Sequence, residues 1–300
     1  MGADKTRAPG LGRRPVLSSA ALVLVLSSAF FHALWNALLK RHEDPENAVV
    51  GVIVVTVVSG GLWALGLEGD AFPSSQALLW TLVAGVLESG YLATLARALH
   101  HAPLGLAYTV SRGGALLLVW PVSVLWLGER LTPWAVVGAA LVALGMAVMN
   151  LVRPQEGRVG EGVLWALACA ACIAGFNVSY KRALGAGAQP PALFTLSLGV
   201  ALPLLVLPRL RGQSWPGLLR KVIARPLLLV AAGLLCTLSF SLLLLALAHS
   251  GAGAVLTLRN TSIAFALGLG ALQGERLGRR QLAGAGLVLL GAVVLGWPRA

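Results

Sequence analysis

The sequence predicts an all-α integral membrane protein whose ten transmembrane helices form two inverted five-helix repeats. Three observations lead to this fold class. The composition suits a chain surrounded by lipid, the apolar residues gather in ten helix-length runs, and the second half of the chain repeats motifs of the first.

The composition excludes an ordinary soluble domain. Hydrophobic residues make up 57% of the chain and charged residues only 11%, with a mean hydropathy of +0.83, whereas about a quarter of the residues in a soluble domain are charged. At about 20 residues per membrane-crossing helix, the 300 residues are used up by roughly ten spans. A water-soluble enzyme carried on a membrane anchor is therefore excluded.

The chain is basic, with 23 Lys and Arg against 11 Asp and Glu and a net charge of +12. In a soluble protein this balance would suggest nucleic-acid binding. Here the basic residues stand singly or in pairs at the ends of apolar runs, where they set topology and contact membrane lipids. We expect lipid as a partner and no nucleic acid.

The apolar runs are bounded by charged residues, Gly and Pro. They cover residues 16–39, 47–67, 77–99, 103–127, 133–151, 162–180, 191–208, 226–249, 253–273 and 281–297. Local chemistry marks some of their starts: Thr132 and Pro133 suit an N-cap and first helical turn, and Pro190-Pro191 can only begin a helix. The runs predict ten helices.

Motifs of the first half recur in the second at offsets between 141 and 148 positions. Trp35-Asn36 and Lys40-Arg41 recur as Phe176-Asn177 and Lys181-Arg182, and Ala84-Gly85 and His101 recur as Ala232-Gly233 and His249. Gly128-Glu129-Arg130-Leu131 recurs as Gly274-Glu275-Arg276-Leu277. Gly138 and Gly145 recur as Gly284 and Gly291. The repeating unit is therefore about 145 residues and five helices long.

An odd number of spans per unit places the second copy upside down relative to the first. We divide the chain into a basic N-terminal tail (1–15), a first repeat (16–151) and a second repeat (162–297). Inverted repeats are the architecture by which transporters alternate access to a site near the middle of the membrane. The repeat therefore favours a transporter, with a cavity lined by the first, third, fourth, sixth, eighth and ninth helices.

The charges give two conflicting indications of orientation. With ten spans, the side of both termini collects eight basic residues and the opposite side thirteen, five of them between Arg209 and Arg225. The positive-inside rule then places the termini outside. The flanks of the first helix favour the reverse, because four basic residues precede it and two, offset by three acids, follow it.

Several of these motifs resemble those of the EamA branch of the drug/metabolite transporter superfamily. They are the doubled Gly-Glu-Arg-Leu turn, the glycine-rich helix after each turn, and His32-Ala33-Leu34-Trp35-Asn36 with Lys40. The resemblance covers about residues 16–297 and implies a secondary transporter in the cell inner membrane that exports amino acids, metabolites or drugs, or moves sugar-phosphate-like anions. It also implies cytoplasmic termini. The early membrane-embedded Glu of small multidrug exporters is missing from the first helix of this chain.

Glu88 is the carboxylate placed deepest in a predicted span, near the centre of the third helix. An ionisable group at that depth marks a function by default, so Glu88 is a candidate for proton coupling or for binding an amine. Tyr91, one turn away, is a possible partner. The repeat-related residue is Cys236, so the symmetry is broken here. The alternative is a structural ion pair between Glu88 and Arg112.

Arg112 and Arg259 occupy near-equivalent positions in the fourth and ninth helices, six to nine residues inside each. Two guanidinium groups there could bind a carboxylate or phosphate from both halves, because Arg presents a planar bidentate fork. The alternative is that the side chains extend toward lipid headgroups. That alternative is stronger for Arg259, whose helix begins nearby.

His32, Asn36 and Lys40 share one helical face, and Asn177 with Lys181 repeats the pattern in the second half. Such a stripe faces a bundle interior or a cavity. For the two Asn residues we favour hydrogen bonds between helices, with substrate contact as the alternative. For His32, packing and cavity lining are equally supported.

The chain carries no nucleotide-binding or catalytic motif and no metal-ligand spacing. We therefore expect that the protein is not an enzyme and has no cofactor. The doubled turns contain Glu129, Arg130, Glu275 and Arg276, which we interpret as helix caps and as ion pairs at the edge of a transport gate. The predicted function is secondary active transport of an amino acid, organic anion or drug-like compound, with export as the direction and protons as the coupling ion. A membrane-embedded or lipid-modifying enzyme is the alternative.

Overall fold

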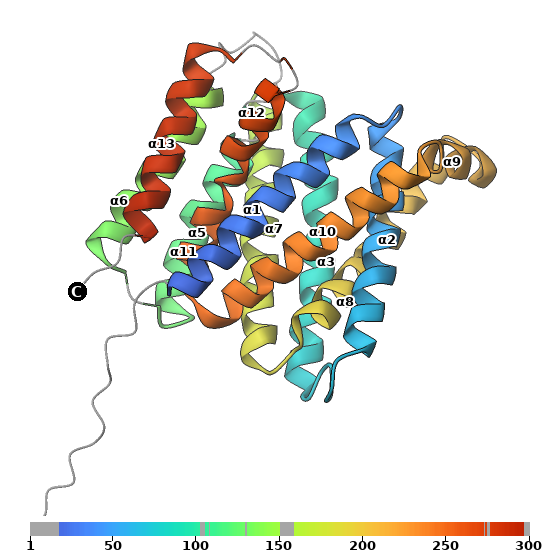
Figure 1. Cartoon of the computed structure of the whole chain (residues 1–300), viewed down its shortest axis with the longest axis horizontal. Coiled ribbons are helices and arrows are strands. Elements are labelled where there is room, and N and C mark those ends of the chain that lie inside the picture. Colours follow the sequence, from blue (N-terminus) through green and yellow to red (C-terminus); the bar gives the residue numbers. More distant parts are fainter. Residues whose placement is uncertain are drawn as a thin grey trace, which may run out of the picture.

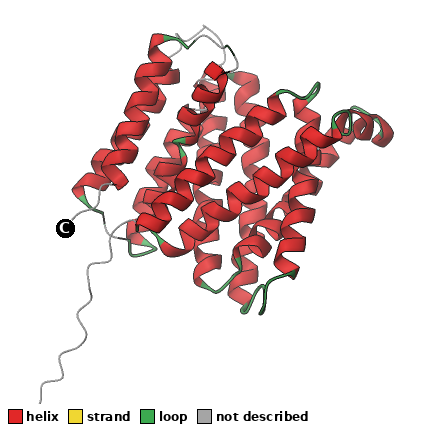
Figure 2. Cartoon of the chain, in the orientation of Figure 1, coloured by secondary structure: helices red, strands yellow, loops and turns green. Residues whose placement is uncertain are grey.

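The computed structural model describes residues 18–102, 106–107, 109–129, 131–150, 159–272, 274 and 277–296. Within these ranges every regular element is helical (Figure 2), which confirms the all-α class. The predicted basic tail 1–15 and three residues of the doubled turns, Arg130, Glu275 and Arg276, lie outside the described residues.

The helices of the first half occupy the ranges predicted from the apolar runs. They are α1 (Ser19–Lys40), α2 (Pro45–Leu65), α3 (Ser75–His101), the π-helical segment η1 (Thr109–Gly113), α5 (Gly114–Leu125) and α6 (Pro133–Asn150). Side chains fix several starts: Ser18, Asp44 and Ser74 each accept a hydrogen bond from the backbone amide three residues on, the usual action of an N-cap.

The helices of the second half follow the same order. They are α7 (Val159–Gly185), α8 (Pro190–Leu210), α9 (Trp215–Val222), α10 (Pro226–His249), α11 (Ala252–Arg259), α12 (Ser262–Leu272) and α13 (Arg279–Gly296). The short helix α9, which the apolar runs did not predict, lies at the edge of the bundle beyond α2 and α8 (Figure 1).

Seven helical segments among the described residues are long and apolar enough to cross a membrane. They are α1, α2, residues 75–98 of α3, residues 160–185 of α7, α8, α10 and the stretch 252–272, which contains α11 and α12. Residues 110–125 and 133–149 form shorter apolar helices. The chain is therefore a multi-pass membrane protein, and the count of ten spans stays a prediction.

Two predicted helices are interrupted in the structure. Run 103–127 contains the π-helical turn η1 before α5 begins at Gly114, and run 253–273 breaks at Asn260 and Thr261. The runs predict continuous helices because only short polar stretches, Ser111-Arg112 and residues 259–262, interrupt them. Local side chains account for the second break: the Thr261 hydroxyl donates to the Leu258 carbonyl at 2.7 Å, and the Asn260 amide donates to the Leu256 carbonyl at 3.0 Å, competing with the helical hydrogen bonds.

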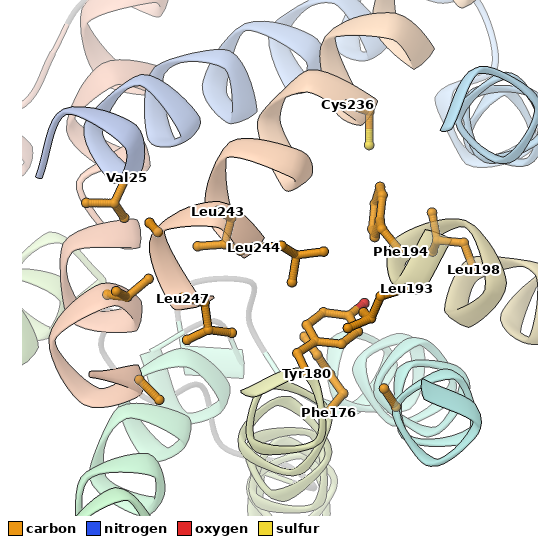
Figure 3. Packing of buried hydrophobic residues seen from close by; sticks show 14 of the residues in the cluster. Val25, Phe176, Tyr180, Leu193, Phe194, Leu198, Cys236, Leu243, Leu244 and Leu247 are labelled. Atoms are coloured by element: carbon orange, nitrogen blue, oxygen red, sulfur yellow. The ribbon is translucent and has the colours of Figure 1, made fainter. Parts of the chain in front are cut away.

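Helices of the two halves pack against each other throughout the bundle (Figure 1). The main contacts pair α1 with α10, α3 with α7, α6 with α13, α2 with α8, α3 with α8 and α2 with α10. Buried side chains such as Tyr180, Phe194 and Leu244 fill the space between α7, α8 and α10 (Figure 3). Each half therefore buries its apolar surface mainly against the other.

The contact of α6 with α13 depends on glycine. A Cβ atom on Gly145 would lie 2.6 Å from the Gly284 carbonyl oxygen, and one on Gly291 would lie 2.7 Å from the Gly138 carbonyl oxygen. Only glycine allows backbones to approach this closely, as small residues do between membrane helices. The contacts run crosswise, 138 with 291 and 145 with 284, so the two helices are antiparallel.

Candidate functional site

A cavity of about 130 Å³ lies between the two halves of the chain, lined by α1, α3, η1, α5, α7, α10, α11 and the break after α11. These are the helices expected around the cavity from the sequence. Six of the seven predicted site residues line it: His32, Glu88, Tyr91, Arg112, Asn177 and Arg259. Its volume is close to that of a cavity of roughly 150 Å³ that admits benzene, which suits a small organic molecule.

Glu88 extends from α3 toward α7 and is 6% exposed. Its Oε1 atom accepts a 2.5 Å hydrogen bond from the hydroxyl of Tyr180, whose oxygen also lies 3.1 Å from Ser197 Oγ on α8. Its Oε2 atom is buried and has no hydrogen-bond partner among the described residues. One carboxylate oxygen is thus held in place by Tyr180, and the other is buried without a hydrogen bond among the described residues.

The contacts of Glu88 differ from two possibilities that the sequence left open. Its partner is Tyr180 and not Tyr91, which packs against Phe176 with ring centroids 5.9 Å apart. The ion pair with Arg112 is absent from the ion pairs of the described residues. The reason is that α3 packs along α7, which brings the Tyr180 hydroxyl to the carboxylate from a helix distant in sequence.

Arg259 ends α11 and is 7% exposed. Its Nη1 donates to the Ser28 carbonyl at 2.5 Å, its Nη2 donates to Ser239 Oγ at 3.0 Å, and its guanidinium carbon lies 5.2 Å from the Phe240 ring centroid. The side chain therefore joins α1, α10 and α11 beside the cavity. Its extension toward lipid headgroups, considered from the sequence, does not occur.

Arg112 lies in the π-helical turn η1, 147 positions before Arg259. Both arginines therefore stand at an interruption of the helix that carries them, and both line the cavity. Helix interruptions are tolerated in a membrane where they line a cavity or are buried in protein. The two interruptions place one guanidinium from each half at the same cavity.

His32 lines the cavity from α1. Its Nδ1 accepts a 3.1 Å hydrogen bond from Trp35 Nε1, and its ring meets those of Trp35 and Phe240 edge to face at centroid distances of 5.3 and 5.9 Å. Because Nδ1 is an acceptor, a neutral His32 carries its proton on Nε2. His32 thus combines the packing and cavity-lining roles considered for it.

The contacts of Asn36 and Asn177 differ from those expected from the sequence. Asn36 is exposed and lies outside the cavity lining, so its placement at the cavity was wrong. Each Nδ2 donates within its own helix, from Asn36 to the His32 carbonyl at 2.7 Å and from Asn177 to the Ile173 carbonyl at 2.8 Å. Hydrogen bonds between helices, favoured from the sequence, are not made by these groups. Asn177 does line the cavity, and its buried Oδ1 has no partner among the described residues.

Residues 160–297 match the model of the EamA-like transporter family. A related protein, the quaternary ammonium compound-resistance protein QacF of Klebsiella aerogenes, is 33% identical over 86 residues, which are 28% of this chain and 78% of QacF. The chain belongs to the EamA-like transporter family. The resemblance found in the sequence is thereby confirmed.

A crystal structure of a protein matches the fold of this transporter with a TM-score of 0.75 at 20% identity, covering 92% of this chain and 96% of the other. That match shows the shared fold. Family membership makes the chain a small-molecule transporter of the cell membrane and favours transport over the membrane-embedded enzyme considered as the alternative.

Four residues at the cavity or in contact with Glu88 were not among those predicted from the sequence. Tyr180, Phe176, Phe240 and Asn260 either hold Glu88 or line the cavity. Tyr180 follows Asn177 by three residues, on the same face of α7, and this spacing was the available signal. Phe240 and Phe176 gave no signal, because aromatic residues in an apolar run are ordinary core residues.

Glu129 acts as the cap that the doubled turn suggested. Its Oε1 accepts from the Ala252 amide at 2.6 Å and its Oε2 accepts from the Gly253 amide at 3.3 Å. Lys181 donates to the Leu247 and Ser250 carbonyls at 2.6 and 2.8 Å, at the end of α10. The Glu129 carboxylate at the start of α11 and the Lys181 ammonium group at the end of α10 both interact favourably with the helix dipoles. Side chains from other parts of the chain therefore stabilise the turn between α10 and α11.

Proposed function

We propose that this transporter carries a small zwitterion or organic anion in the cavity between its halves, with Arg112 and Arg259 binding the carboxylate or phosphate group. The observation that carries the proposal is the position of the two arginines: one from each half, each at a helix interruption, both on the cavity wall. Transporter sites of this kind form at discontinuous helices near the interface of two repeats.

The surroundings of Arg259 support binding of an anion. A guanidinium anchored on Ser28 and Ser239 is fixed in orientation, so little side-chain entropy is lost when it binds a ligand. Both of its present partners are neutral, and a buried cation is stabilised far more by an anion. A carboxylate in the cavity would supply that charge.

Glu88 could make a second polar contact with the substrate and could couple proton movement to transport. Its Oε2 has no partner in the apolar interior among the residues that the structure describes, and an unpaired charge there is costly. Binding a proton or the ammonium group of the substrate neutralises it. If the two compete, proton binding on one side drives substrate release, which is proton-coupled antiport.

Tyr180 is, in this proposal, the residue that positions Glu88. It holds Oε1 on the side of α7 and Ser197, and Oε2 has no partner among the described residues. Its repeat-related position in the first half is occupied by Leu39, and Cys236 corresponds to Glu88. A single proton site in an otherwise symmetric pair of halves would give one coupling proton per cycle.

An amine is the second candidate substrate. Glu88 supplies a negative charge, and Tyr91 and Phe176 supply aromatic faces at the same cavity, a combination that binds alkylated ammonium groups. The resistance protein QacF is named for quaternary ammonium compounds. In that case the two arginines would be structural.

The packing supports alternating access by two inverted halves of five spans each, residues 16–151 and 162–297. The contact of α1 with α10 has its counterpart in that of α7 with α3, and the contact of α3 with α8 in that of α10 with α2. The crosswise glycine contacts of α6 and α13 fit the same two-fold relation. We place the termini in the cytoplasm by analogy with the family and propose export as the direction.

The proposal is tested by the thermal stability of the purified transporter with a panel of amino acids, carboxylates, phosphate esters and quaternary amines, because a ligand that binds the native state stabilises it. We expect zwitterions or anions to raise the melting temperature and Arg112→Gln to remove the effect. Stabilisation by amines alone, retained in Arg112→Gln and lost in Glu88→Gln, would replace the anion proposal by the amine candidate.

A further inference from the structure

The stretch 209–225, from the last turn of α8 to the residue before α10, holds more basic residues than any other stretch outside the predicted spans. It carries Arg209, Arg211, Arg220, Lys221 and Arg225 within 17 positions. The short helix α9 lies in this segment, between two helices that each qualify as a membrane span. Because α9 is only eight residues long and joins the ends of two spans, it lies at the membrane surface.

Helix α9 has an apolar side with two parts. Leu218 and Val222 are buried, 2% and 8% exposed, against the bundle. Trp215, Leu219 and Ile223 adjoin them on the helix surface and are 56%, 44% and 53% exposed. At a membrane surface this exposed edge faces the boundary of the acyl chains, the usual position of Trp and of interfacial amphipathic helices.

Three of the five basic side chains are engaged by the protein. Lys221 Nζ lies 3.6 Å from Asp44 Oδ2, Arg225 Nε lies 3.3 Å from Glu43 Oε1, and Arg209 donates to the Leu205 and Glu46 carbonyls. These contacts tie the segment to the loop between α1 and α2. Its position is therefore fixed by the fold.

Arg211 and Arg220 differ from the other three. Both are exposed, and the side chain of neither makes a hydrogen bond or ion pair within the part of the chain that the structure describes. Arg211 caps the end of α8 and Arg220 lies on the polar side of α9. Two guanidinium groups thus remain at headgroup depth beside an exposed apolar edge.

We propose that α9 lies in the headgroup layer of the membrane and that Arg211 and Arg220 bind the phosphate groups of anionic phospholipids. Arginine binds phosphate through a planar bidentate fork, and basic side chains beside a membrane-inserted apolar edge favour anionic over neutral lipid. The occupant is the lipid surrounding the transporter. The proposal assigns the lipid contact expected for basic residues in general to two named side chains and to anionic headgroups.

The test measures lipid retained by the purified full-length transporter in mixed micelles, with phosphatidylglycerol and phosphatidylcholine in equal amounts, by native mass spectrometry. We expect the wild-type protein to retain phosphatidylglycerol preferentially. The double variant Arg211→Gln/Arg220→Gln should lose that preference by roughly tenfold. The control Arg279→Gln/Arg280→Gln removes two positive charges at α13 and should retain it.

Equal retention of phosphatidylglycerol by the two double variants would overturn the proposal, because the effect would then follow total charge. A second arm replaces the lipid by inorganic phosphate and records the melting temperature. Stabilisation by phosphate without any preference for phosphatidylglycerol would show a site for a free anion and would also overturn it. Both substituted arginines are exposed, so folding of the variants is expected and is checked in the same melting experiment.

Discussion

The hydroxyl of Tyr180 donates a 2.5 Å hydrogen bond to Glu88 Oε1 across the contact of α7 with α3. The two residues come from different halves of the chain, 92 positions apart. The bond fixes a buried carboxylate beside the cavity, and Oε2 remains without a partner among the described residues. In the proposed mechanism this pair is where a proton or a substrate cation is exchanged.

Replacing Tyr180 by Phe removes the hydroxyl and keeps the ring in its packing. Without the hydroxyl, Oε1 loses its donor and the carboxylate is no longer held in one position. We expect the pH profile of transport to differ from that of wild type in a flux assay over a range of pH. Ser179→Ala is the matched control: it removes a neighbouring hydroxyl of α7 that donates to the Gly175 carbonyl of its own helix, and it should keep the wild-type profile. Superimposable profiles for wild type and Tyr180→Phe would contradict a positioning role.

Arg259→Gln should weaken binding of an anionic ligand by at least tenfold. A buried hydrogen-bonded charge contributes about 1.5–3 kcal/mol through each strong contact, and the Gln amide cannot replace the guanidinium charge. The control Ser239→Ala removes the contact to Nη2 and the hydrogen bond from Ser239 Oγ to the Ser28 carbonyl, keeps the guanidinium charge, and should leave binding nearly unchanged. Calorimetric titration compares the two; if they lose affinity equally, Arg259 serves the packing of α1, α10 and α11 and not the ligand.

Glu129→Ala should reduce the free energy of unfolding by about 1–2 kcal/mol, because the amides of Ala252 and Gly253 lose their acceptor at the start of α11. The comparison is Glu161→Ala, whose carboxylate is 51% exposed and lies 3.6 Å from His101. That exposed pair should contribute at most a few tenths of a kcal/mol. Thermal unfolding in detergent measures both, and equal stability of the two variants would argue against the cap.

Asp44 makes a pH-dependent contribution to stability. The hydrogen bond from the Asn47 side chain, with a smaller effect from Lys221, lowers the pKa of the Asp44 carboxyl below its ordinary value. A lowered pKa in the folded state stabilises the protein above the unfolded pKa, and the contribution is lost as the pH falls through the folded value. Asp44→Ala should therefore cost about 1 kcal/mol at neutral pH and progressively less below pH of about 4.

Asp44→Asn separates the two parts of this effect. Asn retains a side-chain oxygen that can cap α2 and removes the charge, so its stability should lie between those of wild type and Asp44→Ala and should change less with pH than that of wild type. A difference between wild type and Asp44→Ala that stays constant from neutral to acid pH would contradict the charge contribution. Melting temperatures over that pH range supply the measurement.

The sequence predicted the features that depend on one chain segment or on the repeat. Composition identified the membrane, apolar runs located the helices, and the spacing of the repeats paired Arg112 with Arg259. Glu88 was found because an acid in the middle of an apolar run is rare. These signals are local or periodic, and a sequence records them directly.

The features that were missed depend on packing or on short-range backbone chemistry. The partner of Glu88 could not be read from the sequence, because Tyr180 reaches it only through the contact of α3 with α7. The helix interruptions at η1 and Asn260 coincide with short polar stretches inside long apolar runs, and a few polar residues do not distinguish an interrupted helix from a continuous one. Helix α9 was not predicted because it is short and contains basic residues, so its few apolar residues do not form an apolar run.

The most direct test of the account measures proton flux through the transporter in liposomes that enclose a pH-sensitive dye. The substrate is the compound that most stabilises the purified protein in the thermal-stability panel. Wild type should move protons when this compound is added on one side, and Glu88→Gln should remain folded and move none. Proton movement by Glu88→Gln at the wild-type rate would contradict the central claim that Glu88 couples protons to transport.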